Sequence, residues 1–544
     1  MNAGEGVTTS GAGETADPGA TPTVSAPAPR KRLAWSTATF SVATGISRVL
    51  GLVREIVARN YFGVTGPINA FEIAFLVPNT IRALVADAAL SSAFVPVFSD
   101  LLERGERKRA WRVASTLVWL TLLGLGAITA LFVLIAPWLM PLLYPHYKPL
   151  VTGLSQVLFP IVALLGVSGI IVGILNTYDE FSIPALTPVA WNIVIILGLV
   201  LGVPHVHGEN HKLYVYAVSI LVGTIVQVFL PIPWLRGRDG RLQMVVDWRD
   251  PAVAKVLRLM LPVTLGLGLI NINALIDGVI GAWLITSNAP SEINAAFRIY
   301  MLPQGMFSVA VATVLFPSLA RFASRRDVDG FRNTVSLGLR QIAFLLVPAS
   351  VVSAVLAEPI TRVIYQRGHF TPGQTPIVAA CLAAFAAGLT FNGTMLMLNR
   401  GFFSLQENWV PTLVALGNLF VNAALDVAFS PVGTWGIPLS TSLVNVAGTG
   451  VLLVLLRRRL GRIEFSGVAS TFVRVTLAAV VAGGAAFAVW KPLDSLVGRS
   501  LGGQLGSLVP ALVAAVVVYL GACALLKVRE MQTLLSLRSR LRRA

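Results

Sequence analysis

Long apolar stretches recur along the whole of this 544-residue chain, and they limit it to one class of fold. Hydrophobic residues make up 55% of the sequence and charged residues only 12%, whereas a soluble domain carries about a quarter charged residues. About 20 apolar residues are enough for a helix to cross a bilayer, so we expect an all-α polytopic membrane protein. The fourteen predicted spans are residues 34–60, 68–99, 113–143, 150–177, 183–203, 213–235, 252–286, 292–320, 334–357, 375–399, 409–429, 435–456, 468–490 and 505–526.

The loops between these stretches alternate between two compositions. One set is rich in Lys and Arg: residues 30–32, 104–112, 236–241, 321–332, 457–462 and 527–543. The other set is nearly free of Arg: residues 63–67, 144–148, 204–211, 287–291 and 430–434. Because loops rich in Lys and Arg stay on the cytoplasmic side, both termini are predicted to be cytoplasmic and the number of spans to be even. This pattern accounts for the net charge of +17 without a nucleic-acid partner.

Two basic linkers divide the predicted spans into two six-helix lobes and a final pair of helices, although the halves share no strong residue-level repeat. The first 29 residues are rich in Gly, Ala, Thr and Pro, which is typical of a disordered tail. The expected units are a cytoplasmic tail at 1–32, a first lobe at 33–236, a linker at 237–251, a second lobe at 252–457, a linker at 458–467, two C-terminal helices at 468–527 and a basic tail at 528–544.

Three arginines lie inside apolar stretches: Arg54 in the first, Arg82 in the second and Arg298 in the eighth. A charged side chain at the centre of a membrane helix costs about 2.5–3.5 kcal/mol on insertion scales. Such residues therefore face a protein interior or a water-filled cavity, and no nearby run of carboxylates neutralises all three. A phosphate is the natural partner of a guanidinium, because the two groups pair through two parallel hydrogen bonds. The three arginines predict a transporter for a phosphorylated substrate.

Neighbouring polar residues extend this candidate substrate site. In the first span, Ser47 is seven residues before Arg54 and so shares a helix stripe with it, and Arg48 is related to Glu55 in the same way. For Arg48 and Glu55, an alternative is that their side chains reach the membrane interface. Arg298 has no acidic residue within a helical turn, which favours an external partner.

The second span combines its arginine with amides and a proline. Asn69, Asn79 and Arg82 follow one another in this span, where Pro78 is expected to break or kink the helix near mid-membrane. Broken helices beside buried charges are typical of substrate sites in transporters. An ion pair of Arg82 with Asp87 is the alternative, although a spacing of five residues aligns poorly on a helix.

A second polar cluster is predicted from Asp277 in the seventh span and from Asn422 and Asp426 in the eleventh. The spacing of four places Asn422 and Asp426 on one helix face. Two carboxylates and an amide at membrane depth offer oxygen ligands to a hard cation such as Na⁺, or a route for a proton. Alternatively, each side chain hydrogen-bonds to a neighbouring helix.

The remaining chemistry-bearing residues indicate neither a catalytic nor a metal site. Cys381 and Cys523 lie in apolar runs far apart, which is typical of packed thiols. His205, His207 and His211 share one outer loop, which we interpret as solvated. The chain contains no GxxxxGK[ST] phosphate-binding loop, so we expect no ATP hydrolysis, no enzymatic activity and no cofactor.

Several motifs together resemble those of one transporter family. They lie at 47–54 (SRVLGLVR), 69–82, 94–96 (FVP), 173–192, 315–319 (LFPSL) and 367–371 (RGHFT). Over residues 34–530 the chain resembles the MurJ (MviN) family of lipid II flippases, within the MOP exporter superfamily. The resemblance implies fourteen helices around a central cationic cavity. It also implies that the undecaprenyl-pyrophosphate-linked disaccharide peptide, lipid II, moves from the inner to the outer leaflet of the bacterial cytoplasmic membrane by alternating access.

The same resemblance carries over to particular residues and partners. The family's essential arginines fall on Arg54, Arg82 and Arg298, with Arg48 nearby. A cation site described for the family resembles the cluster of Asp277, Asn422 and Asp426, so Na⁺ or a proton is the expected coupling ion. Cell-wall synthesis or division proteins are candidate partners.

Four residues depart from the family pattern. Asn69 stands where an Asp is common, and Ala83 follows Arg82 where many members have a second Arg. Phe297 and Met301 occupy positions that are acidic in some members. The cavity is therefore expected to be less balanced by acids, and coupling details are not carried over from the family.

Three other functions remain as alternatives. A multidrug antiporter of the superfamily should carry acids in the first-half cavity to hold cationic drugs, where this chain has arginines. A lipid-linked oligosaccharide flippase fits the charge but fits the motifs less well. A non-transporting scaffold would be favoured if the cavity arginines were dispensable.

The energy source follows from the missing nucleotide motif. Membrane potential, an ion gradient or both must drive an anionic headgroup outward. Moving one charge across 100 mV is worth about 2.3 kcal/mol, and a negative interior favours the exit of an anion.

Overall fold

The computed structural model describes residues 30–85, 88–461 and 465–531. The predicted disordered tail up to residue 29 and Asp87 lie outside the described residues. The α-helices are α1 (Arg30–Phe62), α2 (Ile68–Val85), α3 (Ala88–Glu103), α4 (Arg107–Leu143), α5 (Lys148–Leu158), α6 (Ile161–Thr177), α7 (Ser182–Leu197), α8 (Glu209–Phe229), α9 (Pro251–Ile280), α10 (Ala289–Pro303), α11 (Val309–Ser324), α12 (Val328–Val355), α13 (Ala357–Tyr365), α14 (Thr375–Ser404), α15 (Trp409–Phe429), α16 (Gly436–Leu460), α17 (Phe465–Leu496) and α18 (Leu501–Leu525).

Every predicted span falls on helix, and the described residues contain no β-strand, which confirms the all-α class. Eleven helical segments among the described residues are long and apolar enough to cross a membrane. The expected count of fourteen is not confirmed, because the first, second and seventh predicted spans are not among the eleven. The second is divided between α2 and α3, and only Asn271–Ile285 of the seventh stands out, as a shorter apolar helix.

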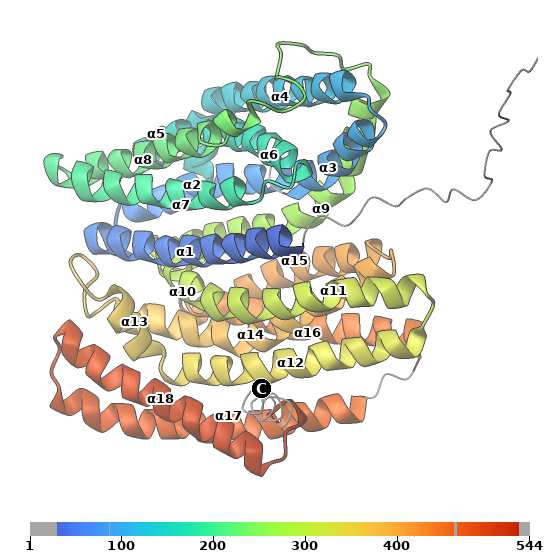
Figure 1. Ribbon diagram of the computed structural model, residues 1–544. Coiled ribbons are helices and arrows are strands. Elements are labelled where there is room, and N and C mark those ends of the chain that lie inside the picture. Colours follow the sequence, from blue (N-terminus) through green and yellow to red (C-terminus); the bar gives the residue numbers. More distant parts are fainter. Residues whose placement is uncertain (1–29, 86–87, 462–464, 532–544) are drawn as a thin grey trace, which may run out of the picture.

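The helices lie roughly side by side in three groups (Figure 1). In this view α2–α8 form the upper group, α10–α16 the middle group and α17 with α18 the lower pair, while α1 lies between the upper and middle groups. Separate buried clusters underlie the groups, for example around Phe159 in the upper group and around Phe385 in the middle one. Because α9 packs on α2 and α3 and also on α15, it connects the upper and middle groups.

Three short π-helical segments interrupt the spans: η1 (Gly198–Gly202), η4 (Gly281–Ile285) and η5 (Gln304–Ser308). Segment η5 begins directly after Pro303, whose ring and missing N–H disturb regular α-helical hydrogen bonding. Wide turns of this kind often occur at functional sites. The expected break at Pro78 does not occur, because α2 continues through this proline from Ile68 to Val85.

The linker between α8 and α9 is held along the N-terminal part of α4. The backbone N–H of Gln243 donates to the Ser115 hydroxyl at 3.0 Å, and that of Asp247 donates to the Thr116 hydroxyl at 3.0 Å. Trp119 Nε1 donates to the Gln243 carbonyl at 3.0 Å. Side-chain partners on α4 thus replace the regular secondary structure that the linker lacks.

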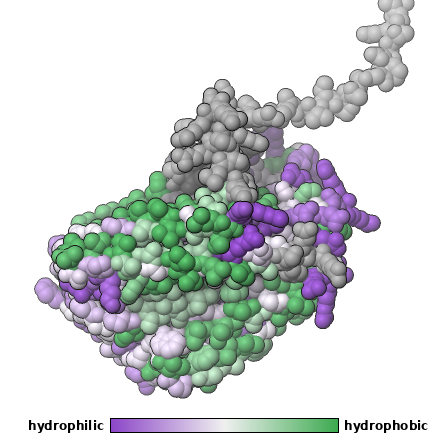
Figure 2. All heavy atoms as spheres, turned by 90° about the horizontal axis from the view of Figure 1, so that it is seen from below, coloured by the Kyte–Doolittle hydropathy of each residue, from purple (hydrophilic) through white to green (hydrophobic). Residues whose placement is uncertain are grey.

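Apolar and hydrophilic residues occupy different parts of the surface, as expected for a protein that spans a bilayer. Figure 2 shows a broad apolar area, with hydrophilic residues gathered mainly toward the ends of the molecule. Cys381 and Cys523 are buried free thiols, which confirms their interpretation as packed residues. The loop histidines, His205, His207 and His211, are exposed, as predicted for a solvated loop.

Candidate substrate cavity and ion cluster

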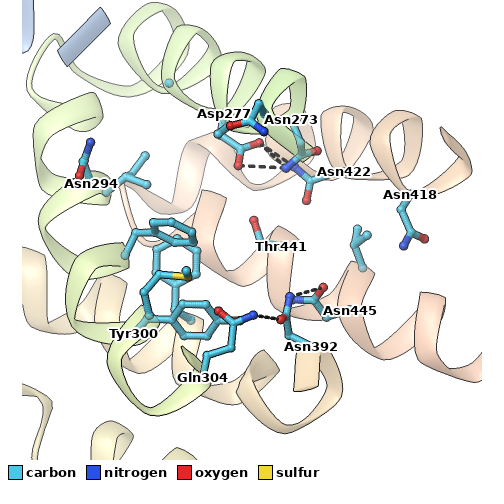
Figure 3. A pocket seen from close by; sticks show the side chains of 18 of the residues that line it. Asn273, Asp277, Asn294, Tyr300, Gln304, Asn392, Asn418, Asn422, Thr441 and Asn445 are labelled. Carbon is cyan, nitrogen blue, oxygen red and sulfur yellow. Dashed lines mark hydrogen bonds between the residues drawn. The ribbon is translucent and has the colours of Figure 1, made fainter. Parts of the chain in front are cut away.

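A cavity of about 470 Å³ lies among α2, α9, α10, α14, α15 and α16 (Figure 3). Its charged wall residues are Glu72, Asp277 and Arg298. Its amide-bearing wall residues are Asn79, Asn271, Asn273, Asn294, Gln304, Asn392, Asn399, Asn418, Asn422 and Asn445. The cavity therefore collects residues from both predicted sites, and most of its polar wall consists of neutral amides.

Arg298 is the one of the three predicted arginines whose side chain lines this cavity. Its side chain is 40% exposed, and its Nε donates to Asn294 Oδ1 at 3.1 Å. The same Nε lies 3.9 Å from Glu55 Oε2. The prediction that Arg298 lacks an acidic partner is therefore wrong. The acid is contributed by α1, far away in the sequence, where helical spacing could not reveal it.

A buried ion-pair network lies behind Arg298 and joins α1 to α2 and α10. Arg59 is 1% exposed, and its guanidinium pairs with Glu55 at 2.8 Å and with Glu72 at 2.7 Å. Arg59 also donates to the Ser291 hydroxyl at the start of α10. One guanidinium between two carboxylates leaves an excess negative charge. The neighbouring Arg298 offsets this excess.

Two further hydrogen bonds close the network into a ring. Asn294 Nδ2 donates to Glu72 Oε2 at 2.7 Å, while Asn294 Oδ1 accepts from Arg298. The direction in which Arg298 points is thus set by Glu55 and Asn294, both of which are tied to Arg59. Sequence reasoning missed Arg59. Its spacing of four from Glu55 was a usable signal, whereas its pairing with Glu72 depends on the fold.

Arg54 and Arg82 are not among the residues that line the cavity. The Arg54 guanidinium lies 4.7 Å from the centre of the Trp191 ring, and its Nε is buried without a hydrogen-bond partner among the described residues. An arginine over a tryptophan face is stabilised by a cation–π interaction. Asn79 Oδ1 accepts from Arg82 at 2.9 and 3.1 Å, which holds Arg82 against a cavity-lining residue. Convergence of all three arginines on one ligand stays a prediction.

Ser47 and Arg48 lie near the middle of α1, where the Arg48 side chain is exposed and Ser47 is half-buried. The Asn192 amide donates to the Ser47 carbonyl at 3.4 Å. Asn192 directly follows Trp191 on α7, so Ser47 and Arg54 face the same helix. This agrees with the stripe that their seven-residue spacing indicates.

Asn69, predicted to bind substrate, is fully buried in a helix joint. Its Nδ2 donates to the carbonyls of Val64 and Gly66, both at 3.1 Å, and its Oδ1 accepts from the Ser291 N–H at 2.9 Å. An aspartate could accept from Ser291 but could not donate to the two carbonyls. The asparagine at this position thus pairs with backbone groups before α2 and at the start of α10, and so connects these two helices.

The predicted cation-site residues do meet, between α9 and α15 (Figure 3). Asn422 Nδ2 donates to Asp277 Oδ1 at 2.8 Å and to Asp426 Oδ2 at 3.0 Å. Asn273 Nδ2 adds a bond to Asp277 at 3.2 Å. Asn422 Oδ1 and Asp426 Oδ1 are buried and have no hydrogen-bond donor within the described part of the chain. Buried polar atoms are rarely left in this state, so these two oxygens fit a cation or a proton.

The family model described as "Lipid II flippase MurJ" matches residues 58–493. The chain belongs to this family. A protein described as "Probable lipid II flippase MurJ" from Vibrio cholerae is 32% identical over 415 residues, which cover 74% of this chain and 78% of the relative. The resemblance predicted from the motifs is confirmed, and it identifies a family of transporters rather than enzymes.

Solved structures agree with membership of the MurJ family. The chain matches a structure described as "Lipid II flippase MurJ, inward closed conformation" with a TM-score of 0.75 and 25% identity, over 89% of this chain and 98% of that one. It matches an inward-facing MATE multidrug transporter of the MOP superfamily with a TM-score of 0.64 and 17% identity, over 78% and 95% of the two chains. The second likeness, at 17% identity, concerns the fold alone.

Proposed function

We propose that this chain moves lipid II from the inner to the outer leaflet of the bacterial cytoplasmic membrane by alternating access. Membership of the MurJ family and the multi-pass helical fold support this function. The observation that carries the proposal is the position of Arg298. Its guanidinium lies on the wall of a cavity between two groups of helices and is oriented by a buried ion-pair network.

The pyrophosphate of lipid II is the group that Arg298 is suited to bind. Its contacts with Asn294 and Glu55 are both made through Nε, at one edge of the guanidinium. The opposite edge can then form two hydrogen bonds with phosphate oxygens. Arg54 and Arg82 contribute further positive charge from α1 and α2. Neither of them lines the cavity, but the electric field of their charges stabilises a dianionic ligand inside it.

Substrate binding and opening of the cavity are coupled through Glu55. The Arg298–Glu55 contact and the Asn294–Glu72 hydrogen bond join α10 to α1 and α2. These two links must break if the helices are to separate on this side. A phosphate on the opposite edge of the Arg298 guanidinium offsets part of its positive charge, so the attraction between Arg298 and Glu55 becomes weaker. Binding of the headgroup thus weakens the connection that holds this side closed.

Complementation of a flippase-depleted bacterium tests the function directly. Wild-type protein should restore growth, and Arg298→Ala should fail although the protein accumulates in the membrane. Arg298→Lys should restore growth poorly, because lysine keeps the charge but loses the fork geometry. The matched control is Arg104→Ala, which removes an arginine from an exposed ion pair with Asp100 and should grow normally. Normal growth of Arg298→Ala would contradict the proposed role.

The orientation in the membrane is proposed from the basic loops, with both termini in the cytoplasm. Both native cysteines are buried, so an added cysteine reports its own side of the membrane. Leu496→Cys, at the exposed C-terminal end of α17, should react with an impermeant thiol reagent in intact cells. Asp329→Cys, at an exposed site in the first turn of α12, should react only after lysis. The reverse pattern would overturn this orientation.

We also propose that Asp277, Asn422 and Asp426 bind the coupling ion, Na⁺ or a proton. The two carboxylates share a neutral amide, and none of the described Lys or Arg residues forms an ion pair with either of them. The unpartnered oxygens of Asn422 and Asp426 supply neutral and charged ligands of the kind that hard cations prefer. An ion gradient would then add to the membrane potential in driving the headgroup outward.

A multidrug antiporter is the second candidate, because the fold is shared with a MATE transporter. Such a protein needs free acids to attract cationic drugs. The two acids of the network beside Arg298, Glu55 on α1 and Glu72 on α2, are both paired with Arg59. This pairing favours the flippase. Drug resistance conferred by the chain on a sensitive host, without growth rescue, would favour the antiporter instead.

A further inference from the structure

A chain of amides crosses the cavity wall away from Arg298. Gln304 Nε2 donates to Asn392 Oδ1, and Asn392 Nδ2 donates to Asn445 Oδ1 at 3.4 Å (Figure 3). The three side chains come from η5, α14 and α16, so three helical segments bring them together. None of them belongs to the Arg59 network or to the cluster around Asp277. The phosphate and ion sites proposed above do not include them.

The amides of the cavity wall are not fully hydrogen-bonded to one another or to the backbone. Gln304 Oε1 is buried and has no partner within the described residues, and the same holds for Asn399 Oδ1 on α14. Both residues line the cavity. Buried acceptors without donors lower stability, so their presence indicates a ligand that brings hydroxyl or N–H donors. An isolated phosphate would bring only acceptors.

Aromatic rings lie next to the amides. The rings of Tyr300 and Phe385 are 5.3 Å apart, and those of Phe297 and Phe385 are 5.6 Å apart. All three residues line the cavity, and Figure 3 shows Tyr300 beside Gln304. Tyr300 and Phe385 are buried and support Phe297, which is exposed. An exposed apolar face beside paired amides suits a sugar, whose ring has apolar C–H faces and polar hydroxyl and acetamido edges. A ligand site of mainly apolar surface with a few placed polar groups has this general form.

We propose that Gln304, Asn392 and Asn445, with the adjacent aromatic rings, bind the neutral saccharide part of the headgroup at a subsite distinct from the pyrophosphate position at Arg298. The inference rests on the proposed function, because it divides the lipid II headgroup between two parts of one cavity. The volume of about 470 Å³ is at the lower end of the roughly 300–1,000 Å³ of drug-sized ligand sites. In this conformation it holds a part of the headgroup, such as a sugar, while the peptide extends beyond it.

The test compares two ligands that share the tail and the pyrophosphate. Purified full-length protein in detergent is titrated with lipid II and with undecaprenyl pyrophosphate, which lacks the disaccharide peptide. Asn392→Ala and Asn445→Ala should each weaken lipid II binding by about tenfold and leave binding of undecaprenyl pyrophosphate unchanged. Arg298→Ala should weaken binding of both ligands. The matched control is Thr449→Val, which removes a hydrogen bond between α16 and α14 one turn beyond Asn445 and should change neither affinity.

The outcomes separate this inference from the proposed function. Equal losses for both ligands in the Asn variants, or no loss for either, would overturn the saccharide subsite and leave the flippase function standing. If wild-type protein binds neither ligand, the proposed function fails and the inference fails with it. Gln304→Ala provides an independent variant on η5 if an Asn variant does not fold, and it should show the same selective loss for lipid II.

Discussion

Two buried polar clusters in this chain contain the same number of carboxylates but differ in how these are balanced. In the first, Glu55 and Glu72 pair with Arg59, and Arg298 lies beside Glu55. In the second, Asp277 and Asp426 share the amide of Asn422, and Asp277 also accepts from the amide of Asn273. The first cluster is complete within the protein and joins helices. The second has no basic partner among the described residues, and we propose that a cation or protons from outside complete it.

The difference has an energetic basis. Removing charges from water is costly, and attraction between the charges offsets that cost only where the partners are close and well oriented. Arg59 meets this condition with two carboxylates below 3 Å. The carboxylates of the second cluster have no such partner, so their burial is tolerated only if a ligand neutralises them. We therefore expect the first cluster to stabilise the fold regardless of the ions in solution. The stability contributed by the second cluster should depend on those ions.

Loss of Arg59 should produce the largest effect. Arg59→Gln leaves two carboxylates buried without a cation, and breaking a buried pair in this way costs about 3–5 kcal/mol. Thermal or denaturant unfolding of the purified protein should show this loss of stability, and transport should be lost with it. Adding Glu55→Gln and Glu72→Gln to the same chain removes the unpaired charges and should restore most of the stability.

Arg104→Gln is the control for that experiment, because the ion pair of Arg104 with Asp100 is exposed. Its expected cost is below about 1 kcal/mol. If Arg59→Gln were as mild as Arg104→Gln, the first cluster would not be a charge-balanced joint, and the contrast between the two clusters would be lost.

The second cluster should respond to Na⁺ instead. An ion at 100 times its dissociation constant stabilises the folded state by about 2.7 kcal/mol. The midpoint of thermal unfolding of the wild-type protein should rise when N-methylglucamine is replaced by Na⁺ at constant ionic strength. Asp277→Asn and Asp426→Asn should abolish that rise and should themselves be stable without Na⁺, because each removes a buried charge.

Liposome assays extend the same comparison to transport. An imposed Na⁺ gradient should accelerate lipid II movement by wild-type protein and have no effect on Asp426→Asn, while an imposed potential should act on both. A proton is the coupling ion if a pH gradient replaces Na⁺ in this assay. Normal transport by both Asp variants with no effect of either gradient would make the second cluster structural.

The two clusters also differ in how far they could be predicted from the sequence. Hydropathy was sufficient for the all-α class, but it did not reveal the division of the second span between α2 and α3 or the short helix α13. Asp277, Asn422 and Asp426 stood out because acids are rare in apolar helices. Arg59 did not stand out, because it lies near the end of an apolar stretch.

The partners of these residues were harder to predict, for a physical reason. Glu72 is 13 residues from Arg59, and Ser291 is 232 residues away, so only helix packing brings them together. The amide wall was missed as well, because single asparagines in several helices form no local pattern. Residue type thus indicates which side chains need a partner, and the fold determines which partner they have.

A carboxylate introduced at Asn69, which connects α2 to α10, should lower the free energy of unfolding by an intermediate amount. Asn69→Asp keeps the acceptor for the Ser291 N–H but removes the donor to the carbonyls of Val64 and Gly66. It also buries a charge at a position that is 0% exposed. We expect a loss of about 1–3 kcal/mol in unfolding experiments. Asn69→Ala, which adds no charge, separates the two causes, and a stability equal to wild type in Asn69→Asp would refute the hydrogen-bonding role.

The smallest effect is expected where an ion pair is open to water, at the inter-lobe linker. Arg109 donates to both oxygens of Asp250 at 3.0 Å, and Asp250 also accepts from the Ala252 N–H at 2.8 Å. These hydrogen bonds, those from Arg109 above all, hold the pKa of Asp250 below its usual value. The ionised carboxylate therefore contributes stability above about pH 4, and this contribution is lost as the pH falls through the lowered pKa.

Hydrogen exchange of the linker measures this contribution. Asp250→Asn should speed exchange of the Gln243 and Asp247 amides by no more than about fivefold, since exposed pairs are worth about 1 kcal/mol or less. About 1 M KCl should reproduce the change in the wild-type protein, because salt screens exposed charges, and should leave the Arg59 network unaffected. Exchange that is insensitive to both the substitution and salt would show that the hydroxyls of Ser115 and Thr116 hold the linker without the ion pair.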